Sequence, residues 1–220
     1  MRTEYDDFLQ LPLFQGIKAD ELQAMLKCIG AYDRYHKKGE YISMSSEALR
    51  CVSLILQGTV HMISEDIWGN KAILVLMHRG ELFGESFACG TSLASVVSFY
   101  AADNVHALYL PFDRVMRSCP NSCTFHHRLV ENMLMRIADK NVQLMEKVKI
   151  ISKRTLREKI LTYFSLQAQL KGSKEFDLPI GRIGLAEYLC ADRSALTREL
   201  ARMKDDGLIS FERNHFRLLA

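Results

Sequence analysis

Two arginines and two hydroxyl residues share one face of a segment near the C-terminus. The face comprises Arg193, Ser194, Thr197 and Arg198. Residues one turn apart on an α-helix lie on the same side, so these four side chains would point together into solvent. A guanidinium can donate two hydrogen bonds to guanine in the major groove of DNA, and a hydroxyl bonds to several bases less selectively. The chemistry open to this face is therefore recognition of DNA bases.

The residues around this face predict a helix-turn-helix over residues 185–209. Apolar residues mark the buried sides of the two helices: Leu185 and Leu189 in the first, then Leu196, Leu200 and Met203 in the second. Between them residues 190–192 fit a tight turn, with Asp192 as the N-cap of the second helix and Gly207 ending it. On these residues alone, an ordinary amphipathic helix with a solvated basic face stays open as an alternative.

Further basic residues follow the predicted recognition face. We expect Arg202 and Lys204 to meet DNA phosphates rather than bases. Residues 208–211 and 215–218 predict two short strands joined through a turn that holds Arg213. The pair would form the wing of a winged helix, and Arg213 at its tip could touch the DNA backbone or the minor groove. A hairpin that only closes the core of the domain is an equal alternative.

The charge of the chain is unevenly distributed. The 220 residues carry a net charge of +3, which alone decides little. Residues 149–220 hold 14 Lys and Arg against 9 Asp and Glu, whereas residues 1–148 hold 15 against 17. The positive charge therefore lies with the helix-turn-helix, as expected for a phosphate-binding domain attached to a near-neutral partner domain.

The N-terminal half predicts a β-barrel or β-roll. Short apolar stretches recur between turn residues and glycines, at residues 52–56, 60–63, 72–77, 96–100 and 106–110. Before them, Leu22, Met25, Leu26 and Ile29 form the stripe of a helix. The fold class is thus α+β, with an N-terminal double-stranded β-roll, a long helix and a C-terminal winged helix-turn-helix.

The long helix, residues 121–151, carries a heptad pattern. The predicted dimer seam consists of Val130, Leu134, Ile137, Asn141, Leu144 and Val148. A lone Asn at a core position holds a parallel two-stranded coiled coil in register, so Asn141 favours a homodimer. A two-fold dimer would present two helix-turn-helix units to a palindromic site on double-stranded DNA. The alternative is a helix packed lengthwise on its own domain, because Leu129 and Met133 widen the apolar face.

Composition favours a cytoplasmic protein. No apolar run reaches membrane-spanning length, and the first residues show no signal-peptide pattern. The six cysteines lack paired spacing, which argues against a disulfide framework or a zinc site. Cys119 and Cys123 are the one close pair, and Pro120 between them disfavours a shared metal; whether they have a redox role stays open.

The order of parts resembles the Crp/Fnr family of transcription regulators over nearly the whole chain. Local motifs carry the likeness: residues 11–16 with Glu21-Leu22 are similar to the first helices of the family, residues 54–60 to a strand-turn-strand, and residues 80–85 to the start of the effector cassette. The resemblance implies a cyclic-nucleotide-binding-like roll over residues 1–120, a dimerisation helix at 121–151 and a DNA-binding domain at 152–220. It further implies a signal sensed against the long helix, and contact with RNA polymerase if the protein is an activator. Activation and repression cannot be separated here.

The resemblance also indicates what the signal is not. Cyclic-AMP receptors follow the Gly-Glu pair, here Gly84-Glu85, with an Arg-Ser pair that neutralises the cyclic phosphate; Ser95 and Val96 stand at those positions. The helix positions that give hydroxyls to adenine correspond to Ile137 and Ala138. Burying a phosphate charge without a cation is unfavourable, so we expect no useful binding of cyclic AMP.

Other cofactors of the family fit no better, and the effector stays unidentified. The sequence lacks the closely spaced N-terminal cysteines of iron–sulfur oxygen sensors, and His78, His126 and Cys89 are weak candidates for axial haem ligands. The predicted effector pocket is Gly84, Glu85, Phe87, Ser95, Val96, Val97, Leu134 and Ile137. Its apolar part would suit a small molecule or, equally, an empty packed core.

No catalytic or phosphate-binding motif is evident, so we expect a regulator rather than an enzyme. Two alternatives stay open. One is a roll that serves protein interaction without specific DNA binding, and the other is a regulator that senses haem or redox state.

Overall fold

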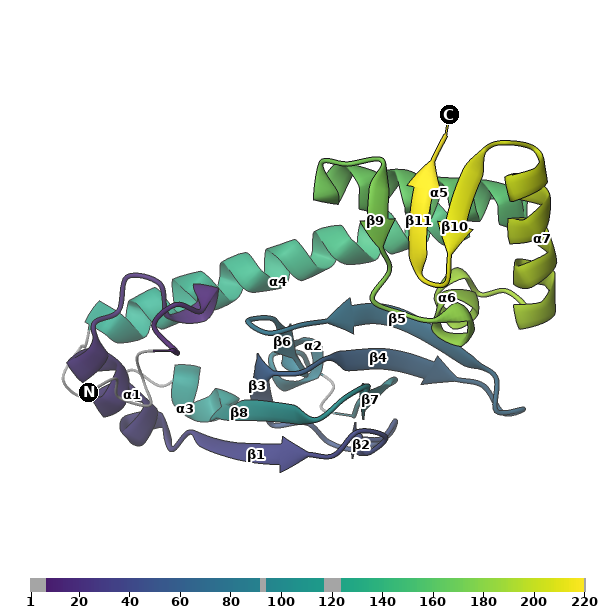
Figure 1. Ribbon diagram of the computed structural model, residues 1–220. Coiled ribbons are helices and arrows are strands. Elements are labelled where there is room, and N and C mark those ends of the chain that lie inside the picture. The colour runs from purple at the N-terminus through teal and green to yellow at the C-terminus, as the bar shows by residue number, and fades with distance from the viewer. Residues whose placement is uncertain (1–6, 92–93, 117–123, 220) are drawn as a thin grey trace. The chain divides into compact units, whose positions relative to one another are not determined.

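The computed structural model describes residues 7–91, 94–116 and 124–219 (Figure 1). Contacts divide the chain into two compact units. The first contains residues up to Glu65 and Leu76–Gln143, and the second contains Asp66–Val75 and the chain from Leu144 onward. The predicted boundaries at residues 120 and 151 stay predictions. No helix among the described residues is long and apolar enough to cross a membrane.

Two antiparallel sheets build the predicted roll. One sheet has the order β1-β8-β3-β6, formed by β1 (Tyr32–His36), β8 (Val105–Pro111), β3 (Cys51–Gln57) and β6 (Leu82–Phe83). The other has the order β2-β7-β4-β5, formed by β2 (Tyr41–Ser43), β7 (Ser98–Ala101), β4 (Val60–Glu65) and β5 (Lys71–Met77). All five predicted apolar stretches contain strands, which confirms the roll.

Three strands of the roll were not predicted. The strand β1 mixes charged and aromatic side chains without alternation and is mostly exposed, whereas β2 and β6 are too short to show a pattern. The segment 96–100 begins its strand later than predicted, at Ser98, because Ser95 and Val97 hydrogen-bond to each other instead. Two short helices complete the roll, α2 (Glu85–Ala88) and α3 (Phe112–Met116).

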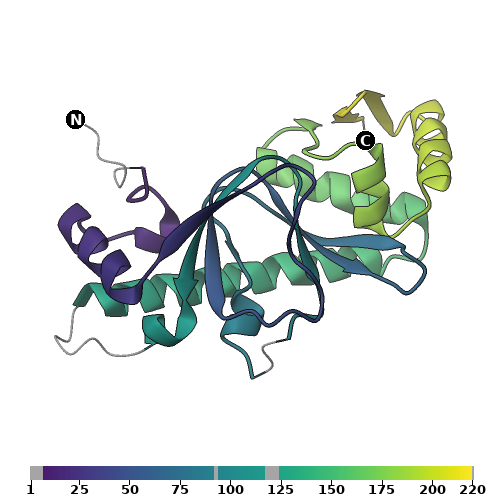
Figure 2. The ribbon, with the colours of Figure 1, turned by 90° about the horizontal axis from the view of Figure 1, so that it is seen from below.

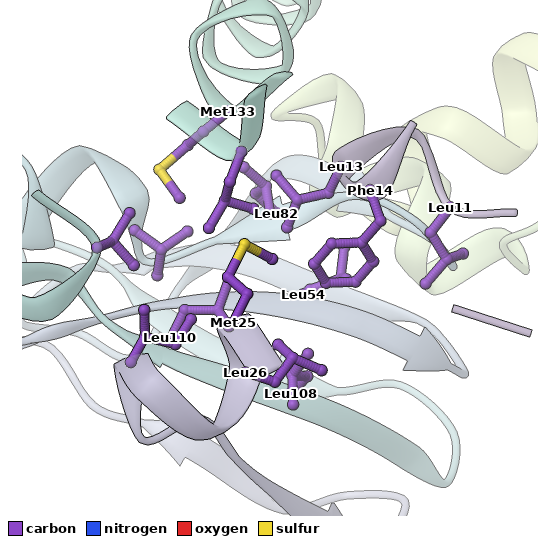
Figure 3. Close-up of a cluster of buried hydrophobic side chains, with 14 of the residues drawn as sticks. Leu11, Leu13, Phe14, Met25, Leu26, Leu54, Leu82, Leu108, Leu110 and Met133 are labelled. Atoms are coloured by element: carbon purple, nitrogen blue, oxygen red, sulfur yellow. The ribbon is translucent and has the colours of Figure 1, made fainter. Parts of the chain in front are cut away.

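The core of the first unit forms between one face of the β1-β8-β3-β6 sheet and the N-terminal helices. The turn η1 (Pro12–Phe14) and α1 (Ala19–Ile29) supply Leu13, Phe14 and Met25, which meet Leu54 and Leu108 of the sheet (Figure 3). The predicted stripe of α1 is confirmed, since the buried residues of this helix are the four named from the sequence. Burial of this face stabilises the unit in proportion to the apolar area removed from water.

The long helix α4 (Thr124–Ile151) lies against this core over its first half (Figure 2). Leu129 and Met133 are buried in the core, and His126 Nε2 lies 2.8 Å from the carbonyl oxygen of Val115 in α3. Asn132 donates hydrogen bonds to the carbonyls of Leu13 and Gln15. Part of α4 therefore packs lengthwise on its own domain, which was the alternative to a dimer seam.

The second unit places a small sheet beside three helices. It contains α5 (Leu156–Lys171), α6 (Arg182–Leu189) and α7 (Arg193–Asp205), and a sheet of order β10-β11-β9 from β10 (Ile209–Glu212), β11 (His215–Leu218) and β9 (Glu175–Asp177) (Figure 1). The predicted wing is confirmed, and β9 adds a strand that was not predicted. Phe164 packs on Phe176 and Phe216 at ring-centroid distances of 5.6 and 4.6 Å, which ties α5 to the sheet.

Candidate nucleic-acid interface and effector region

The structure confirms the helix-turn-helix and its turn. The helix α6 ends at Leu189, and its C-cap Cys190 turns the chain with a φ of 50°. Asp192 then caps α7 by accepting a hydrogen bond from Ala195 N at 2.8 Å. At the other end, Gly207 adopts a φ of 71° and the amide of Leu208 bonds to the carbonyl of Met203. These bonds satisfy backbone groups that a helix end leaves unpaired, so both ends of α7 are fixed locally.

One side of α7 is buried and the other carries the predicted recognition face. Leu196, Leu200 and Met203 are almost fully buried in the unit. The four residues predicted to reach bases, Arg193, Ser194, Thr197 and Arg198, are all exposed. The Thr197 hydroxyl donates to the carbonyl of Arg193 at 2.9 Å, so its proton is already engaged. Ser194 is thus the freer of the two hydroxyls.

Arginines of this unit divide into paired and unpaired ones. Arg157 of α5 reaches Glu199 at 2.6 Å and Asp206 at 2.7 Å, which anchors α5 to the far side of α7. Arg193 and Arg198, by contrast, have no carboxylate partner within the described part of the chain. Their guanidiniums keep all of their donors available for a ligand.

The two cations predicted to meet phosphates are exposed but not equally free. Arg202 Nη1 lies 3.7 Å from Glu199, a long contact on a side chain that is 70% exposed. Lys204 Nζ lies 5.4 Å from the centroid of the Phe211 ring. Both charges can turn toward a phosphate at little cost, since exposed ion pairs and cation–π contacts are weak.

Two arginines lie at or near the wing. Arg213 is at its turn, as predicted, and Arg182 of α6 was not predicted. Arg213 is exposed with a φ of 53°, between the paired residues Glu212 and His215. Arg182, the first residue of α6, lies 4.7 and 4.8 Å from the rings of Phe211 and Phe216, and burial lowers its pKa. The helix dipole disfavours a basic residue at the start of a helix, so the position of Arg182 was the signal in the sequence that could have marked it. Arg182 positions the wing against α6.

An apolar row runs along the face of α4 that its own domain leaves uncovered. Exposed apolar residues follow a heptad-like spacing with Asn141 among them: Leu134, Ala138, Met145 and Val148. Leu134 is 67% exposed and Val148 59%. The predicted seam residues Val130 and Ile137 are half-buried and pack on the core of the roll instead. Leu134, Asn141 and Val148 of the predicted seam therefore lie in the uncovered row. The other row residues, Ala138 and Met145, each follow a predicted seam residue by one position.

The predicted effector residues do not form one enclosed pocket. Gly84 and Glu85 are buried at the start of α2, and Phe87 is half-buried. Ser95 is 2% exposed, and its hydroxyl donates to the carbonyl of Val97 at 2.6 Å. Val96 and Leu134, however, are 75% and 67% exposed. The pocket drawn from the sequence thus needs correction, because Val96 turns outward in the loop before β7, whereas Ser95 and Val97 on either side of it are buried.

The α4 residue that meets the effector cassette is a lysine. Lys140 is 5% exposed and donates from Nζ to the carbonyl of Leu82 at 2.8 Å, and Gln143 donates to Glu81 at 2.9 Å. Ile137 is half-buried and Ala138 exposed, and neither has a polar side-chain atom that could make such a bond. A lysine on a long helix is typical of a solvated surface, so no sequence signal marks this one as buried.

Lys140 is also the cation that faces Glu85. Burial raises the pKa of Glu85, whereas the charge of Lys140 lowers it and that of Glu81 raises it. Burial likewise lowers the pKa of Lys140, and Glu85 and Glu81 raise it. Glu85 Oε2 is buried with no hydrogen-bond partner among the described residues. The cassette therefore contains an internal positive charge where the sequence suggested that none was present.

Two observations in the described residues bear on metal and redox chemistry. No group of three or more His, Cys, Asp and Glu side chains gathers there in a way that could hold a metal ion. Burial raises the pKa of the Cys89 thiol to about 11, which disfavours the reactive thiolate. The pair Cys119 and Cys123 lies outside the described residues.

Comparisons with known proteins agree with both halves of the chain. A cyclic nucleotide-binding domain family matches residues 33–121, and a Crp-like helix-turn-helix domain family matches residues 149–220. The transcriptional activator protein FnrL of Cereibacter sphaeroides is 30% identical over 194 residues, covering 82% of this chain and 73% of FnrL. The transcriptional activator protein anr of Pseudomonas aeruginosa is 24% identical over 189 residues, covering 83% of this chain and 75% of anr.

A solved structure shows the same fold. The c-di-GMP responsive global regulator CLP of Xanthomonas campestris superposes with a TM-score of 0.75 at 14% identity, covering 92% of this chain and 100% of that chain. A cyclic-nucleotide-binding-like roll followed by a long helix and a winged helix-turn-helix defines a DNA-binding transcription regulator. The chain belongs to the Crp/Fnr family of such regulators. The named relatives are transcription regulators, which are not enzymes.

Proposed function

We propose that the protein binds a palindromic DNA site as a homodimer and regulates transcription in response to a signal sensed by the roll. The observation that carries this proposal is the pair of unpaired guanidiniums, Arg193 and Arg198, on the exposed face of α7. Both lie on the second helix of a helix-turn-helix, the helix that enters the major groove in this motif. The DNA contact residues are Arg193, Ser194, Thr197, Arg198, Arg202, Lys204 and Arg213.

The chemistry of the face assigns roles within this set. Arg198 and Arg193 suit guanine, because each can donate two bonds to its O6 and N7 atoms. The free hydroxyl of Ser194 discriminates less, so we expect a relaxed base preference beneath it. Arg202 and Lys204 lie further along α7 and suit phosphates, which position the protein without reading sequence. Arg213 on the wing suits the backbone or the minor groove.

The uncovered row on α4 supports the homodimer. Large apolar side chains such as Leu134 and Val148 are costly to leave in water, and a second copy of the same helix would cover both rows at once. Asn141 lies within that row and would pair with its own copy across the two-fold axis, which fixes the register. The two α7 helices of such a dimer would meet half-sites about one helical turn apart.

Signal sensing by the roll would reach the DNA-binding unit through α4. The helix α4 contributes residues to both compact units, so a change at the roll could be passed along one continuous helix. Lys140 already bonds to the cassette, and Ser95 has satisfied its hydroxyl within its own loop. We therefore propose that the effector is not cyclic AMP; titration calorimetry that shows micromolar binding of cyclic AMP would contradict this.

The DNA part of the proposal is tested by selecting bound sequences from a random pool with the full-length protein. We expect a palindrome that contains a guanine in each half-site. Gel shifts on the selected site should lose most of their affinity in the double variant Arg193→Ala, Arg198→Ala. The matched control is Arg217→Ala, because Arg217 is an exposed arginine of the same unit that pairs with Glu175. Loss of binding in the control, or selection of no motif, would contradict the proposal.

The dimer is tested separately by sedimentation equilibrium without DNA. Leu134→Glu with Val148→Glu places like charges along the uncovered row and should yield a monomer. Glu131→Gln, an exposed change on the same helix, should leave the dimer intact.

If the named activators FnrL and anr are a guide, the protein contacts RNA polymerase and activates transcription. Transcription in vitro from a promoter bearing the selected site would decide between activation and repression.

A further inference from the structure

The C-terminal end of α6, directly before the turn of the helix-turn-helix, has its last four carbonyl groups bonded. An α-helix leaves these four groups without partners inside the helix. In α6 the turn itself satisfies the first two, because Cys190 and Ala191 donate their backbone amides to the carbonyls of residues 186 and 187. The last two carbonyls, those of Tyr188 and Leu189, accept hydrogen bonds from lysine side chains of two other helices.

These side chains are Lys147 of α4 and Lys159 of α5. Lys147 Nζ donates to the carbonyl of Tyr188, and Lys159 Nζ donates to that of Leu189 at 3.4 Å. A cation at the C-terminus of a helix also interacts favourably with the helix dipole. All four residues belong to the second compact unit. Within that unit, α4 and α5 therefore both hold the first helix of the helix-turn-helix at the end that leads into the turn.

Lys147 is the more enclosed of the two lysines. It is 3% exposed, and its Nζ lies 3.6 Å from the centroid of the Tyr188 ring, which packs on the Tyr163 ring of α5 at 4.8 Å. Burial lowers the pKa of Lys147 to about 8, while Cys190 raises it and Lys159 lowers it, so the amine is still mostly protonated at neutral pH. A buried ammonium needs compensation, and the carbonyl and the ring face of Tyr188 both supply it.

The position of Lys147 lies between the proposed dimer surface and the recognition face. Met145 and Val148 of the uncovered row are exposed and lie within two positions of Lys147 on α4. Its partner Tyr188 precedes Arg193, the first residue of α7, by five positions. A shift of α6 against the end of α4 would therefore move the recognition face relative to the helix that forms the dimer.

We propose that Lys147 is a positioning residue that holds α6 and α7 in one orientation to the end of α4, and thereby sets the half-site spacing that the dimer accepts. The inference rests on the proposed homodimer and its palindromic site. Lys147 is buried, so it acts through Tyr188 and α6 rather than by touching DNA.

The geometry of DNA makes spacing a sensitive measure of this role. One added base pair moves a half-site by about 3.4 Å along the helix axis and rotates it by about 35°. A recognition helix that is held rigidly cannot follow both movements, whereas a loosened one can. Loosening also removes preorganisation, so binding to the best site becomes weaker while other spacings are tolerated better.

The test is a series of gel shifts with the full-length protein on the selected palindrome, in which the spacer between half-sites is changed by one or two base pairs. The wild type should lose at least about tenfold in affinity for a change of one base pair. Lys147→Met keeps the length and apolar stem of the side chain but removes its charge and donors. It should bind the best site more weakly and lose less than about threefold for the same change.

The ratio of affinities between spacings separates positioning from a general loss of stability. Partial unfolding lowers the active fraction equally for every duplex, so it leaves this ratio unchanged. The base preference within each half-site should also stay as in the wild type, because the recognition face is not altered. Lys149→Met is the matched control, since Lys149 is an exposed lysine of the same helix, and it should keep the ratio of the wild type.

The outcomes that oppose the proposal are distinct from those that oppose the dimer. A ratio in Lys147→Met as steep as that of the wild type, or equal flattening in Lys149→Met, would overturn the positioning role alone. If Lys147→Met does not fold, Lys159→Met removes the second lysine at the end of α6 and is judged by the same ratio. A wild type that is indifferent to spacing would contradict the proposed homodimer, and the positioning role with it.

Discussion

The exposed face of α7 and the buried cassette beside α4 use positive charge in opposite ways. On α7, Arg193 and Arg198 extend into solvent with no carboxylate partner in the structure that is described. In the cassette, Lys140 is 5% exposed and is committed to the carbonyl of Leu82 and to the charge of Glu85. A free exposed cation is available to a ligand, whereas a buried and bonded one holds the fold together. Each region can therefore be tested by removing its cation.

The largest effect is expected from Lys140→Met. Removing one partner of a buried charge pair typically costs about 3–5 kcal/mol, because the other group stays buried without compensation. Here both the carbonyl of Leu82 and the carboxylate of Glu85 would lose their cation. Urea unfolding followed by circular dichroism measures the loss. Lys149→Met on the exposed side of the same helix is the control, and a loss as small as that of the control would show that Lys140 does not stabilise the cassette.

The pH dependence of the stability of Lys140→Met tests the Lys140–Glu85 pair further. Burial raises the pKa of Glu85 above its ordinary value of 4.5, and Lys140 opposes the rise. Without Lys140 the pKa of Glu85 should rise further, so the folded state favours the neutral acid. The contribution of Glu85 to the stability of Lys140→Met should then be fully present below pH 4.5 and be lost as the pH rises through the raised pKa. Between the unfolded and folded pKa values, the free energy of unfolding should drop by about 1.4 kcal/mol for each step of one in pH.

The double variant Lys140→Met, Glu85→Gln isolates that titration. Glutamine cannot ionise, so the fall in stability between acid and neutral pH should largely disappear. Glu81 also lies near this pair and stays in both variants, which allows its contribution to be subtracted. A fall of equal size in the single and double variants would assign the pH dependence to a group other than Glu85.

On α7, the substitution Arg198→Ala should cost about 1–3 kcal/mol of discrimination at one base pair of each half-site. Selection from a random pool should return a motif that is relaxed at that guanine and unchanged elsewhere. Ser194→Glu provides the complementary change, because a carboxylate accepts a bond from cytosine and should sharpen a neighbouring position. An unchanged motif from Arg198→Ala would refute the assignment of this residue.

The contrast between the two regions also explains what the sequence could predict. The signals for α7 are local: a capping aspartate, an apolar stripe at helical spacing and a glycine after the last turn all fall within residues 192–207. The predicted helix, its buried side and its exposed face were therefore correct. Lys140 has no such local signal, because its partner Leu82 lies far away in the sequence and only the folded roll brings them together.

Two further differences between the prediction and the structure also arise from tertiary contacts. The heptad pattern of α4 has two apolar sides, and the sequence alone did not show that Val130 and Ile137 would turn toward the roll. The strand β9 has one apolar residue, Phe176, and forms because β11 offers a free edge and a phenylalanine to pack on. Local patterns predict elements, whereas the partner of each face is decided by tertiary contacts.

The smallest effect is expected at Arg202, which is exposed like Arg193 and Arg198 but also has a carboxylate nearby. Its guanidinium is 70% exposed yet lies 3.7 Å from Glu199, which also bonds to Arg157. If Arg202 contacts a phosphate, Arg202→Ala should weaken binding uniformly across DNA sequences and reduce the slope of log affinity against log salt by about 1. Gel shifts over a series of salt concentrations measure that slope, with Arg217→Ala as the control. A change in the selected motif, rather than in the slope, would place Arg202 among the residues that read bases.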